Sequence, residues 1–175
     1  IEKRDRNIAH RMIEEAMLAT NICAGEFFTA HPGYGIFSGH IGFRPERIND
    51  ALSLIKEDRP DLEPGDLTQL SAFQALFKEL RHNVSGDYKN TQLHSLLQRM
   101  LQAGALTFES TPHFGLGFNA YAMVTSPIRR YNDLYNHLAI KRILRGLPPE
   151  AIENKTAFAE ALQEALNTGR QACRY

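Results

Sequence analysis

The chain has 175 residues, 43% of them apolar and 23% charged, and its 20 Lys and Arg residues balance 20 Asp and Glu residues. This length predicts one domain with enough chain to bury a core, and the composition excludes a disulfide-rich scaffold and a disordered chain. The zero net charge argues against a small nucleic-acid-binding domain, because a basic excess supplies most of the affinity of such domains for phosphate.

The cysteines and the uncharged stretches indicate where the protein works. Cys23 and Cys173 lie far apart and form no redox or metal-ligand motif, which favours a reduced, cytoplasmic protein. The longest run without Asp, Glu, Lys or Arg, 110–128, is broken by prolines, glycines and polar residues, so no membrane span is predicted. The first residues are charged and do not form the pattern of a leader peptide.

A long helix is predicted over 7–28, where there is no proline and apolar residues recur at helical spacing. Apolar residues also fall outside the main stripe, so the middle of this helix is predicted to be buried on several sides. Glu14 and Glu15 lie in that middle, and a buried carboxylate needs a partner or a wet cavity. An ion pair of either glutamate with Arg11 would satisfy this need.

The remaining elements predict a helix-dominated α/β fold. Residues 31–43 predict turns and short extended pieces, and 57–66 predicts an acidic surface loop. The short apolar stretch 120–125, bounded by glycines and by Ser-Pro, predicts a buried strand. Further helices are predicted from apolar periodicity and from start and stop residues, over 44–55, 67–81, 91–103, 126–145 and 158–175.

The junction TSPIRRY is the segment richest in chemistry. Ser126 is predicted to cap the helix that follows, which places Arg129 and Arg130 in its first turn, against the helix dipole. An anion held between the arginines and the helix end would explain this placement. The alternative is a ladder at i, i+4 spacing, in which Asp133 pairs with Arg129 and His137 follows Asp133.

Other common site patterns are missing from the sequence. The seven histidines form no zinc-binding spacing, and the GLG within 113–118 is only part of a dinucleotide fingerprint and precedes the predicted strand. There is no nucleophile elbow, and no cluster of aspartates dense enough to hold two magnesium ions. No metal ligand is therefore predicted within the chain itself.

Three blocks of sequence resemble the ribonuclease II family, the RNB-domain exoribonucleases. The signature is HFGLGFNAYAMVTSPIRRYNDLYNH, residues 113–137, and the blocks AHRMIEEAMLATNICA and YGIFSGHIGF are similar to upstream segments of the same family. The blocks occur in the family's order, and the match is strongest over about 7–146. The chain is thus identified as the C-terminal part of an RNB catalytic domain, with a truncated C-terminal helix over 151–175.

The resemblance implies a processive, Mg²⁺-dependent 3′→5′ exoribonuclease that hydrolyses single-stranded RNA to nucleoside 5′-monophosphates. In the family the magnesium ligands, and the aromatic residues that clamp the last bases, lie upstream of the region matched here. The expected partners are therefore RNA and the remainder of the enzyme, namely the N-terminal half of the RNB domain and the cold-shock-like and S1-like RNA-binding domains. The family's late glutamate, in an AERD-like segment, is expected just past Tyr175.

The resemblance also implies roles for single residues. Arg129 matches the arginine that contacts the phosphate at the scissile end, where it would stabilise negative charge in the transition state. Glu14, or else Glu15, matches the glutamate that holds the terminal nucleotide, and Arg130 matches the adjacent basic position. The other matched positions are expected to contact RNA or to support the site: Thr125, Ser126, Tyr131, His113, Asp133, His137 and Arg11.

Two expectations follow for activity. The 175-residue chain alone is predicted to be inactive, because the metal-binding half is elsewhere; the alternative function is a non-catalytic RNA-binding or scaffold module. The zero net charge is a sum of unlike regions, since 121–145 holds five bases against one acid and 46–66 holds seven acids against three bases. The local field, and not the total charge, is expected to guide RNA.

Overall fold

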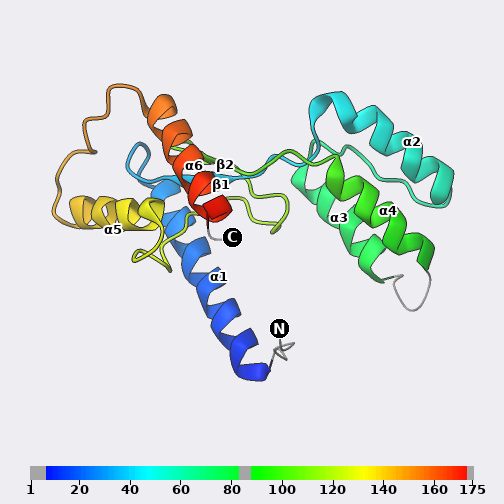
Figure 1. Ribbon diagram of the computed structural model, residues 1–175, viewed down its shortest axis with the longest axis horizontal. Helices are drawn as coiled ribbons and strands as arrows, with labels where there is room; N and C mark the ends of the chain where they lie inside the picture. The colour runs from blue at the N-terminus through cyan, green and yellow to red at the C-terminus, as the bar shows by residue number, and fades with distance from the viewer. Residues whose placement is uncertain (1–6, 83–87, 173–175) are drawn as a thin grey trace. The chain divides into compact units, whose positions relative to one another are not determined.

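The computed structural model describes residues 7–82 and 88–172. Helices dominate, as predicted (Figure 1). The elements in chain order are α1 (Ile8–Thr29), β1 (Phe37–Gly39), a 3₁₀ turn η1 (Pro45–Arg47), α2 (Ile48–Asp58), α3 (Leu70–His82), α4 (Tyr88–Arg99), β2 (Ala105–Thr107), α5 (Tyr131–Leu144) and α6 (Lys155–Ala172). The chain divides into two compact units, each with its own core, where its length alone predicted one core.

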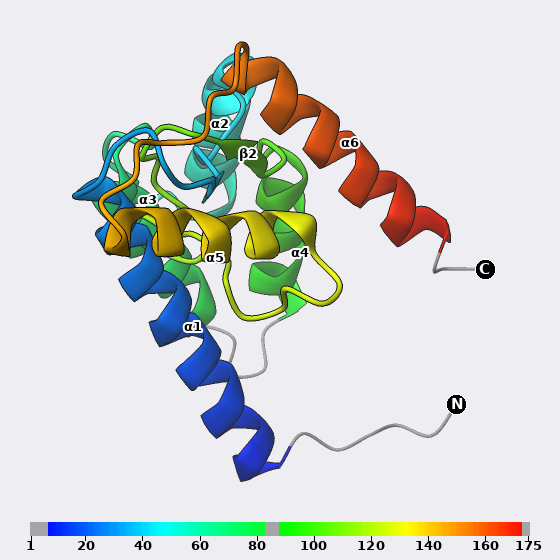
Figure 2. The same ribbon diagram turned by 90° about the vertical axis from the view of Figure 1, so that its left-hand side faces the viewer.

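The first unit comprises 1–39, 105–111 and 120–175. Its strands β1 and β2 pair antiparallel, with Ser38 opposite Leu106, and α6 packs against β2. The helix α5 lies beside the C-terminal half of α1 in both views (Figures 1 and 2). The core between these elements includes residues that are almost fully buried, among them Phe28, Ile36, Phe37, Ala122 and Ala159.

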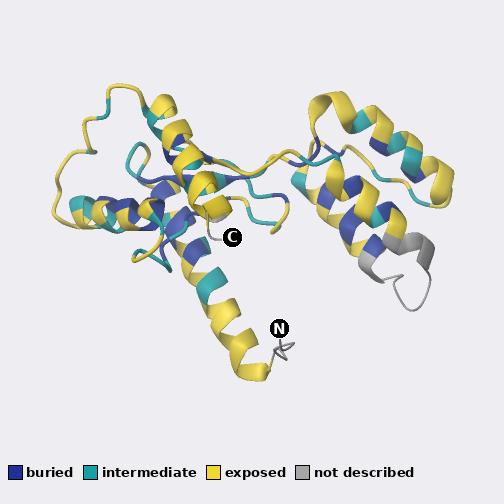
Figure 3. Ribbon diagram, in the orientation of Figure 1, coloured by how far each residue is buried: buried dark blue, intermediate teal, exposed yellow. Residues whose placement is uncertain are grey.

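Helix α1 is buried over only part of its length. A capping box starts it, in which the Asn7 side chain accepts from the His10 N–H at 3.0 Å. Residues 7–16 are all exposed, whereas Asn21, Ala24, Gly25 and Phe28 are buried (Figure 3). The prediction that the middle of this helix is buried on several sides is therefore wrong: in the described chain, the core reaches only its C-terminal half.

The second unit comprises 40–104 and 112–119. The helices α2, α3 and α4 surround a cluster of aromatic and aliphatic side chains. Phe73 stacks on Phe77 at 4.5 Å between ring centroids, and Phe43 and Phe114 meet Phe73 edge to face. The three helices predicted here are confirmed, with ends shifted by a few residues, and the acidic segment after α2 is a largely exposed loop.

The segment 120–125 is not a strand, so that prediction is wrong. Alternate residues of this segment nevertheless donate backbone hydrogen bonds, as they would in a strand. The N–H groups of Ala122, Val124 and Ser126 donate in turn to the Asn21 carbonyl, the Asn21 side chain and the Asp133 carboxylate. Because the partners are mostly side chains on helices and not a neighbouring strand, the apolar pattern resembles a strand while no ladder forms.

In the C-terminal part, the predicted end of α5 is confirmed to within one residue. Helix α5 ends at Leu144, and Gly146 follows with a φ of +65°, a conformation that glycine adopts readily. Helix α6 covers most of the predicted last helix, although the predictions about Cys173 and about the chain beyond Tyr175 lie outside the described residues. Within 7–82 and 88–172, no helix has the length and apolar character needed to cross a lipid bilayer.

Candidate functional site

The TSPIRR residues form a turn that precedes α5, and not the first turn of the helix. Arg130 is the N-cap, with φ −129° and ψ 117°. The N–H groups of Arg129 and Arg130 both donate to the Ser126 carbonyl, at 3.3 and 3.1 Å. The predicted helix start at Ser126 is thus wrong, because the Ser126 N–H donates to the Asp133 carboxylate at 2.8 Å and fixes the turn against the side of α5.

Asp133 joins the turn to the helix through two partners. Its side chain is fully buried, and its Oδ2 accepts from Arg130 Nη2 at 2.8 Å as well as from Ser126. Arg130 also reaches the Thr125 hydroxyl at 3.5 Å. An acid in the first turn of a helix also suits the helix dipole. The predicted Arg129–Asp133 ladder is therefore wrong, since the carboxylate pairs with Arg130.

Arg129 is left available by this arrangement. Its side chain is exposed, and within the described residues it has no hydrogen-bond or ion-pair partner. The neighbouring Ile128 is also fully exposed. The turn thus presents one guanidinium to solvent, on a backbone held by the Ser126 carbonyl and the Asp133 carboxylate. Such a group can donate two parallel hydrogen bonds to a phosphate or carboxylate.

Three side chains hold the preceding segment, 121–125, between α1 and α5. Asn21 donates to the Tyr121 hydroxyl at 2.9 Å and to the Thr125 hydroxyl at 3.4 Å, while its Oδ1 accepts from the Val124 N–H at 2.9 Å. Asn136 donates to the Met123 carbonyl, and the His137 ring contacts the Val124 carbonyl at 2.8 Å. His137 is therefore beside the site, through a backbone contact and not through Asp133.

Sequence reasoning missed Asn21 and Asn136. Both are almost fully buried, and Asn136 also bonds both backbone groups of Ile36. A signal existed for Asn21, because a polar amide stood in a helix predicted to be buried, and buried amides need partners. The argument applied to Glu14 and Glu15 would have selected Asn21 instead, since both glutamates are exposed.

A glycine brings α1 very close to this segment. A Cβ atom added at Gly25 would lie 2.8 Å from the carbonyl carbon of Ala120 and 2.9 Å from the Tyr121 nitrogen. Those distances are shorter than van der Waals contact, so only glycine allows the approach. Asn21 and Gly25 are one helical turn apart, and together they form the surface on which 120–125 rests.

Several buried polar atoms at the start of α5 have no hydrogen-bond partner among the described residues. They are both amide atoms of Asn132, Oδ1 of Asp133 and Nε of Arg130. Buried polar atoms without partners are uncommon in folded proteins and unfavourable by about 1–3 kcal/mol each. The residues that follow Arg129 thus contain a carboxylate paired with Arg130, together with buried N and O atoms that form no hydrogen bond within the described chain.

The other predicted residues are dispersed. Glu14, Glu15 and Arg11 lie on the exposed half of α1. Because both glutamates are exposed, the burial that led to the expected ion pair with Arg11 is absent. Tyr131, at the start of α5, is 54% exposed.

His113 belongs to the second unit, where its ring stacks on His40 at 5.5 Å between centroids. Burial lowers the pKa of both imidazoles, and for His113 the neighbouring His40 lowers it further.

The outer face of α5 carries apolar residues next to a small cavity. Tyr131, Leu134 and Leu138 are between 41% and 54% exposed. Tyr131 and Leu138 line a cavity of about 300 Å³ together with Tyr34, Tyr135 and Phe158. Burial raises the pKa of Tyr135 to about 12, so its hydroxyl stays protonated. The Arg142–Glu150 ion pair, at 3.0 Å, lies among the lining residues.

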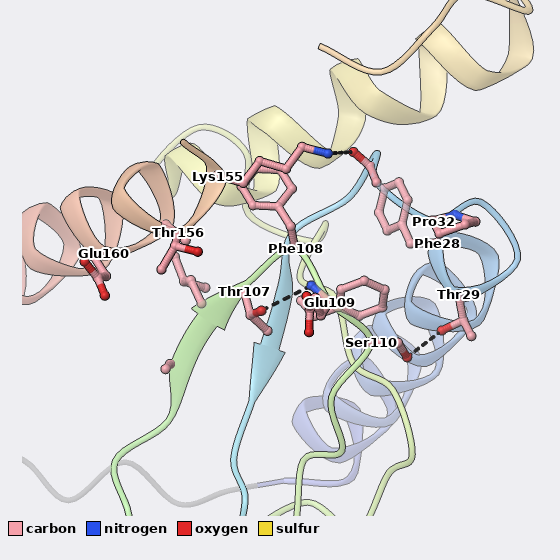
Figure 4. A pocket seen from close by; sticks show the side chains of 15 residues that line it. Phe28, Thr29, Pro32, Thr107, Phe108, Glu109, Ser110, Lys155, Thr156 and Glu160 are labelled. Carbon is pink, nitrogen blue, oxygen red and sulfur yellow. Dashed lines mark hydrogen bonds between the residues drawn. The ribbon is translucent and has the colours of Figure 1, made fainter. Parts of the chain in front are cut away.

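A larger cavity, of about 680 Å³, lies between α6, the two strands and the end of α1 (Figure 4). Three of its polar side chains have partners within the unit. Lys155 donates to the Gly33 carbonyl at 2.8 Å and sits 5.4 Å from the centre of the Phe108 ring, and the hydroxyls of Thr29 and Ser110 are 2.9 Å apart. None of the predicted site residues lines this cavity.

The described residues do not provide the ligands of a magnesium site. They contain no group of three or more His, Cys, Asp or Glu side chains placed to hold a metal ion. Mg²⁺ prefers near-ideal octahedral oxygen coordination, usually from carboxylates, phosphates and water. The donor set of this part of the chain therefore does not fit a resident metal.

Similarity to known proteins indicates the family of the chain. A family model described as the RNB domain matches residues 1–146. Exoribonuclease 2 of Photorhabdus laumondii is 37% identical over 163 residues, which are 93% of this chain and 24% of that protein. Exoribonuclease 2 of Aeromonas hydrophila is 38% identical over 150 residues, which are 85% of this chain and 21% of that protein. The chain thus spans about a quarter of the length of these relatives.

Solved structures share the fold at lower identity. Yeast Ssd1, described as a pseudonuclease, has a TM-score of 0.69 at 17% identity, over 93% of this chain and 20% of its own. RNase R of Mycoplasma genitalium has a TM-score of 0.62 at 22% identity, over 79% of this chain and 21% of its own. The same enzyme in complex with ribose methylated single-stranded RNA gives 0.57 at 21% identity, over the same shares. Together with the RNB match, these similarities confirm the predicted fold class: the chain belongs to the RNB domain family.

Proposed function

We propose that the chain is the C-terminal part of the catalytic domain of a processive 3′→5′ exoribonuclease that hydrolyses single-stranded RNA to nucleoside 5′-monophosphates. Two relatives at 37% and 38% identity are named exoribonuclease 2, which supports an RNA-degrading enzyme. The RNase R of Mycoplasma genitalium has been solved in complex with single-stranded RNA, which supports RNA as the substrate class. RNA decay in the cytoplasm is part of the same proposal.

One observation carries the proposal: Arg129 is exposed on a turn whose other arginine, Arg130, is paired with Asp133 of α5. A guanidinium in this position can donate to the non-bridging oxygens of the scissile phosphate. Those oxygens carry more negative charge as a nucleophile adds to phosphorus, so the contact strengthens in the transition state and lowers the barrier. Arg130 would hold the turn in place and add positive potential beside the phosphate.

The supporting contacts come from both neighbouring elements. Glu14 lies on the exposed face of α1 and would accept hydrogen bonds from the hydroxyls of the terminal nucleotide. Tyr131 would meet the RNA from the start of α5, and the hydroxyls of Thr125 and Ser126 would support the turn. Arg11, Asp133 and His137 would support the contacts indirectly, and His113, which belongs to the second unit, is proposed as a separate RNA contact.

The metal and the remaining RNA contacts are proposed to come from residues outside this chain. Mg²⁺ would polarise the phosphate and activate the attacking water, and it would be held by carboxylates of the N-terminal half of the RNB domain. The cold-shock-like and S1-like domains would hold the RNA further along the strand. This chain would then supply the phosphate contact and the grip on the terminal nucleotide.

The first test compares the longer protein that contains this chain with the chain alone. Release of mononucleotides from a uniformly labelled single-stranded RNA with Mg²⁺ is expected for the longer protein and not for residues 1–175. In the longer protein, Arg129→Ala is expected to lower kcat by about 10²–10³-fold and to change KM by less than about fivefold. Arg145→Ala is the matched control, because Arg145 is also exposed and lies at the far end of α5.

Three results would contradict the proposal. Turnover by residues 1–175 alone would show that no other half is needed. Equal losses in kcat/KM for Arg129→Ala and Arg145→Ala would show that only general positive charge matters. A rise in KM with an unchanged kcat for Arg129→Ala would make Arg129 a binding contact and not a group that stabilises the transition state.

A second candidate function is a non-catalytic RNA-binding or scaffold module. It is favoured by the likeness to Ssd1, since a protein described as a pseudonuclease has a TM-score of 0.69 to this fold. The same assay separates the two functions. A longer protein that binds the labelled strand but releases no nucleotide over a range of Mg²⁺ concentrations would support the module, and steady release of mononucleotides would exclude it.

A further inference from the structure

The two proposed RNA contacts of the first unit stand on different elements. Glu14 belongs to α1, whereas Arg129 belongs to the turn that follows the segment 121–125. An enzyme that grips a terminal nucleotide and cleaves the adjacent phosphate needs a fixed distance between these two groups. The contacts that join α1 to 121–125 therefore determine how well the two groups act together.

Those contacts converge on Asn21. Its backbone carbonyl accepts from the Ala122 N–H at 3.2 Å, and its side chain bonds Tyr121, Val124 and Thr125. The residue is 3% exposed. It uses both kinds of polar atom that an amide has, so neither a pure donor nor a pure acceptor can replace it in every contact.

Asn21 also shares a helix face with Glu14. The two residues are seven positions apart, which is close to two helical turns and about 10 Å along the axis. The last residue that Asn21 contacts, Thr125, directly precedes the turn at Ser126, and Thr125 also meets Arg130. The helix α1 thus links Glu14 to Asn21, and hydrogen bonds link Asn21 through Thr125 to the turn that carries Arg129.

We propose that Asn21 is a positioning residue: it fixes the turn carrying Arg129 relative to Glu14 on α1, and so sets the distance between the scissile phosphate contact and the terminal-nucleotide contact. This inference rests on the proposed function. Asn21 itself touches neither RNA nor the reacting atoms. Its role is distinct from that of Asn136, which is also buried. Within the described chain, the hydrogen bonds of Asn136 join the Met123 carbonyl to the Ile36 backbone and do not include Thr125.

Asn136 is the control for Asn21, because both are buried asparagines of the first unit. In the longer protein, kcat, KM and the unfolding temperature are measured for Asn21→Ala, Asn136→Ala and Asn49→Ala, with Asn49 as an exposed asparagine on α2. All rates are taken well below the lowest unfolding temperature. Asn21→Ala is expected to lower kcat by about tenfold or more with KM within about twofold, because the phosphate contact forms less often in the productive geometry.

Asn136→Ala is expected to lower the unfolding temperature at least as much as Asn21→Ala, with a loss of kcat below about threefold. Asn49→Ala is expected to change neither quantity. Equal losses of kcat for Asn21→Ala and Asn136→Ala, at similar losses of stability, would overturn the inference and leave Asn21 as a core residue only. An unchanged kcat for Asn21→Ala would overturn it as well.

A distance measurement tests the same inference without activity. Spin labels are attached at Glu14→Cys and Ile128→Cys, both exposed sites, in a background without other accessible cysteines. The distance distribution between the labels is expected to be clearly broader in Asn21→Ala than in the parent protein, while Asn136→Ala changes it less. An unaltered distribution in Asn21→Ala would overturn the inference.

The two proposals fail in different ways. If the longer protein with Asn21 intact releases no nucleotides, the proposed function fails, and the width of the distance distribution still reports on Asn21. If the longer protein is active and Asn21→Ala is as active as the parent, the positioning role fails and the proposed function stands.

Discussion

Each of the two units of the chain is stabilised internally by a different kind of interaction. In the second unit, helices pack around phenylalanine and leucine side chains such as Phe73, Phe77 and Leu80. In the first unit, the segment that leads to Arg129 lies among buried polar side chains, and all four buried polar residues of the described chain, Asn21, Asn132, Asp133 and Asn136, belong to this unit. Apolar packing builds the second unit, whereas directional hydrogen bonds fix the shape of the candidate site.

The largest loss in the free energy of unfolding is expected where a buried charge loses its partner. Asp133→Ala leaves the Arg130 guanidinium and the Ser126 N–H without their shared acceptor, and breaking a buried ion pair in this way costs about 3–5 kcal/mol. The free energy of unfolding from urea titration measures the loss, and hydrogen exchange of peptides from 120–137 locates it. A loss below about 1 kcal/mol would mean that the turn does not depend on this carboxylate.

Truncating a side chain in the apolar core should lower the free energy of unfolding nearly as much, but the loss should be located in the second unit. Leu80 is fully buried in the second unit, and Leu80→Ala should lower the free energy of unfolding by about 3 kcal/mol through lost burial and a residual cavity. Faster hydrogen exchange is expected in peptides from α3 and α4, with little change in 120–137. Equal acceleration in both units would show that they unfold as one.

The histidine pair makes the second unit sensitive to acid. Burial lowers the pKa of His40 and of His113 below the ordinary value near 6.5, so folding favours the neutral rings. Each Nδ1 also accepts a backbone N–H, from Gly42 and Leu116 respectively. The stability that the neutral pair contributes is complete above the unfolded pKa and is lost as the pH falls below about 6.5.

Urea titrations between pH 7.5 and pH 5 should therefore show stability falling with acid, and His113→Gln should reduce the slope. His31→Gln is the matched control, because His31 belongs to the first unit and contacts the Phe27 carbonyl. An unchanged slope in His113→Gln would refute the assignment of the acid effect to the stacked pair.

The smallest effect is expected at an exposed ion pair of the second unit. Arg47 and Asp50 are 2.9 Å apart, and both side chains are about half exposed. Such pairs contribute about 0.2–1 kcal/mol, so Asp50→Asn should change the free energy of unfolding by about 0.5 kcal/mol or less. A larger loss in urea titration at moderate salt would show that charges, too, stabilise the second unit.

The same comparison explains what the sequence could predict. The helices of the second unit were predictable because apolar residues at helical spacing determine both their existence and their packing. The apolar pattern of 120–125 led to a wrong prediction of a strand. The hydrogen-bond partners of this segment, Asn21 and Asp133, lie on helices and not on a neighbouring strand. The burial of α1 was predicted wrongly for a similar reason, since composition does not show which half of a helix a distant core will cover.

The sequence predicted which residues belong to the candidate site, but not which of them form hydrogen bonds or ion pairs with one another. The motif TSPIRRY singled out Arg129 and Arg130, yet the choice of Arg130 as the partner of Asp133 depends on a turn that local propensity did not predict. Ser followed by Pro is a common helix start, and here the bond from the Ser126 N–H to Asp133 outweighed it.

The exposed half of α1 has a consequence for how RNA would be gripped. A helical stretch that buries little surface is marginal in water at this length, so the turns that contain Ile8, Met12 and Glu14 should open much more often than those from Asn21 onward. A nucleotide held by Glu14 would have to close these turns first. Substrate binding should then appear as slower amide exchange over 8–18, so the terminal-nucleotide grip would be completed by its own substrate.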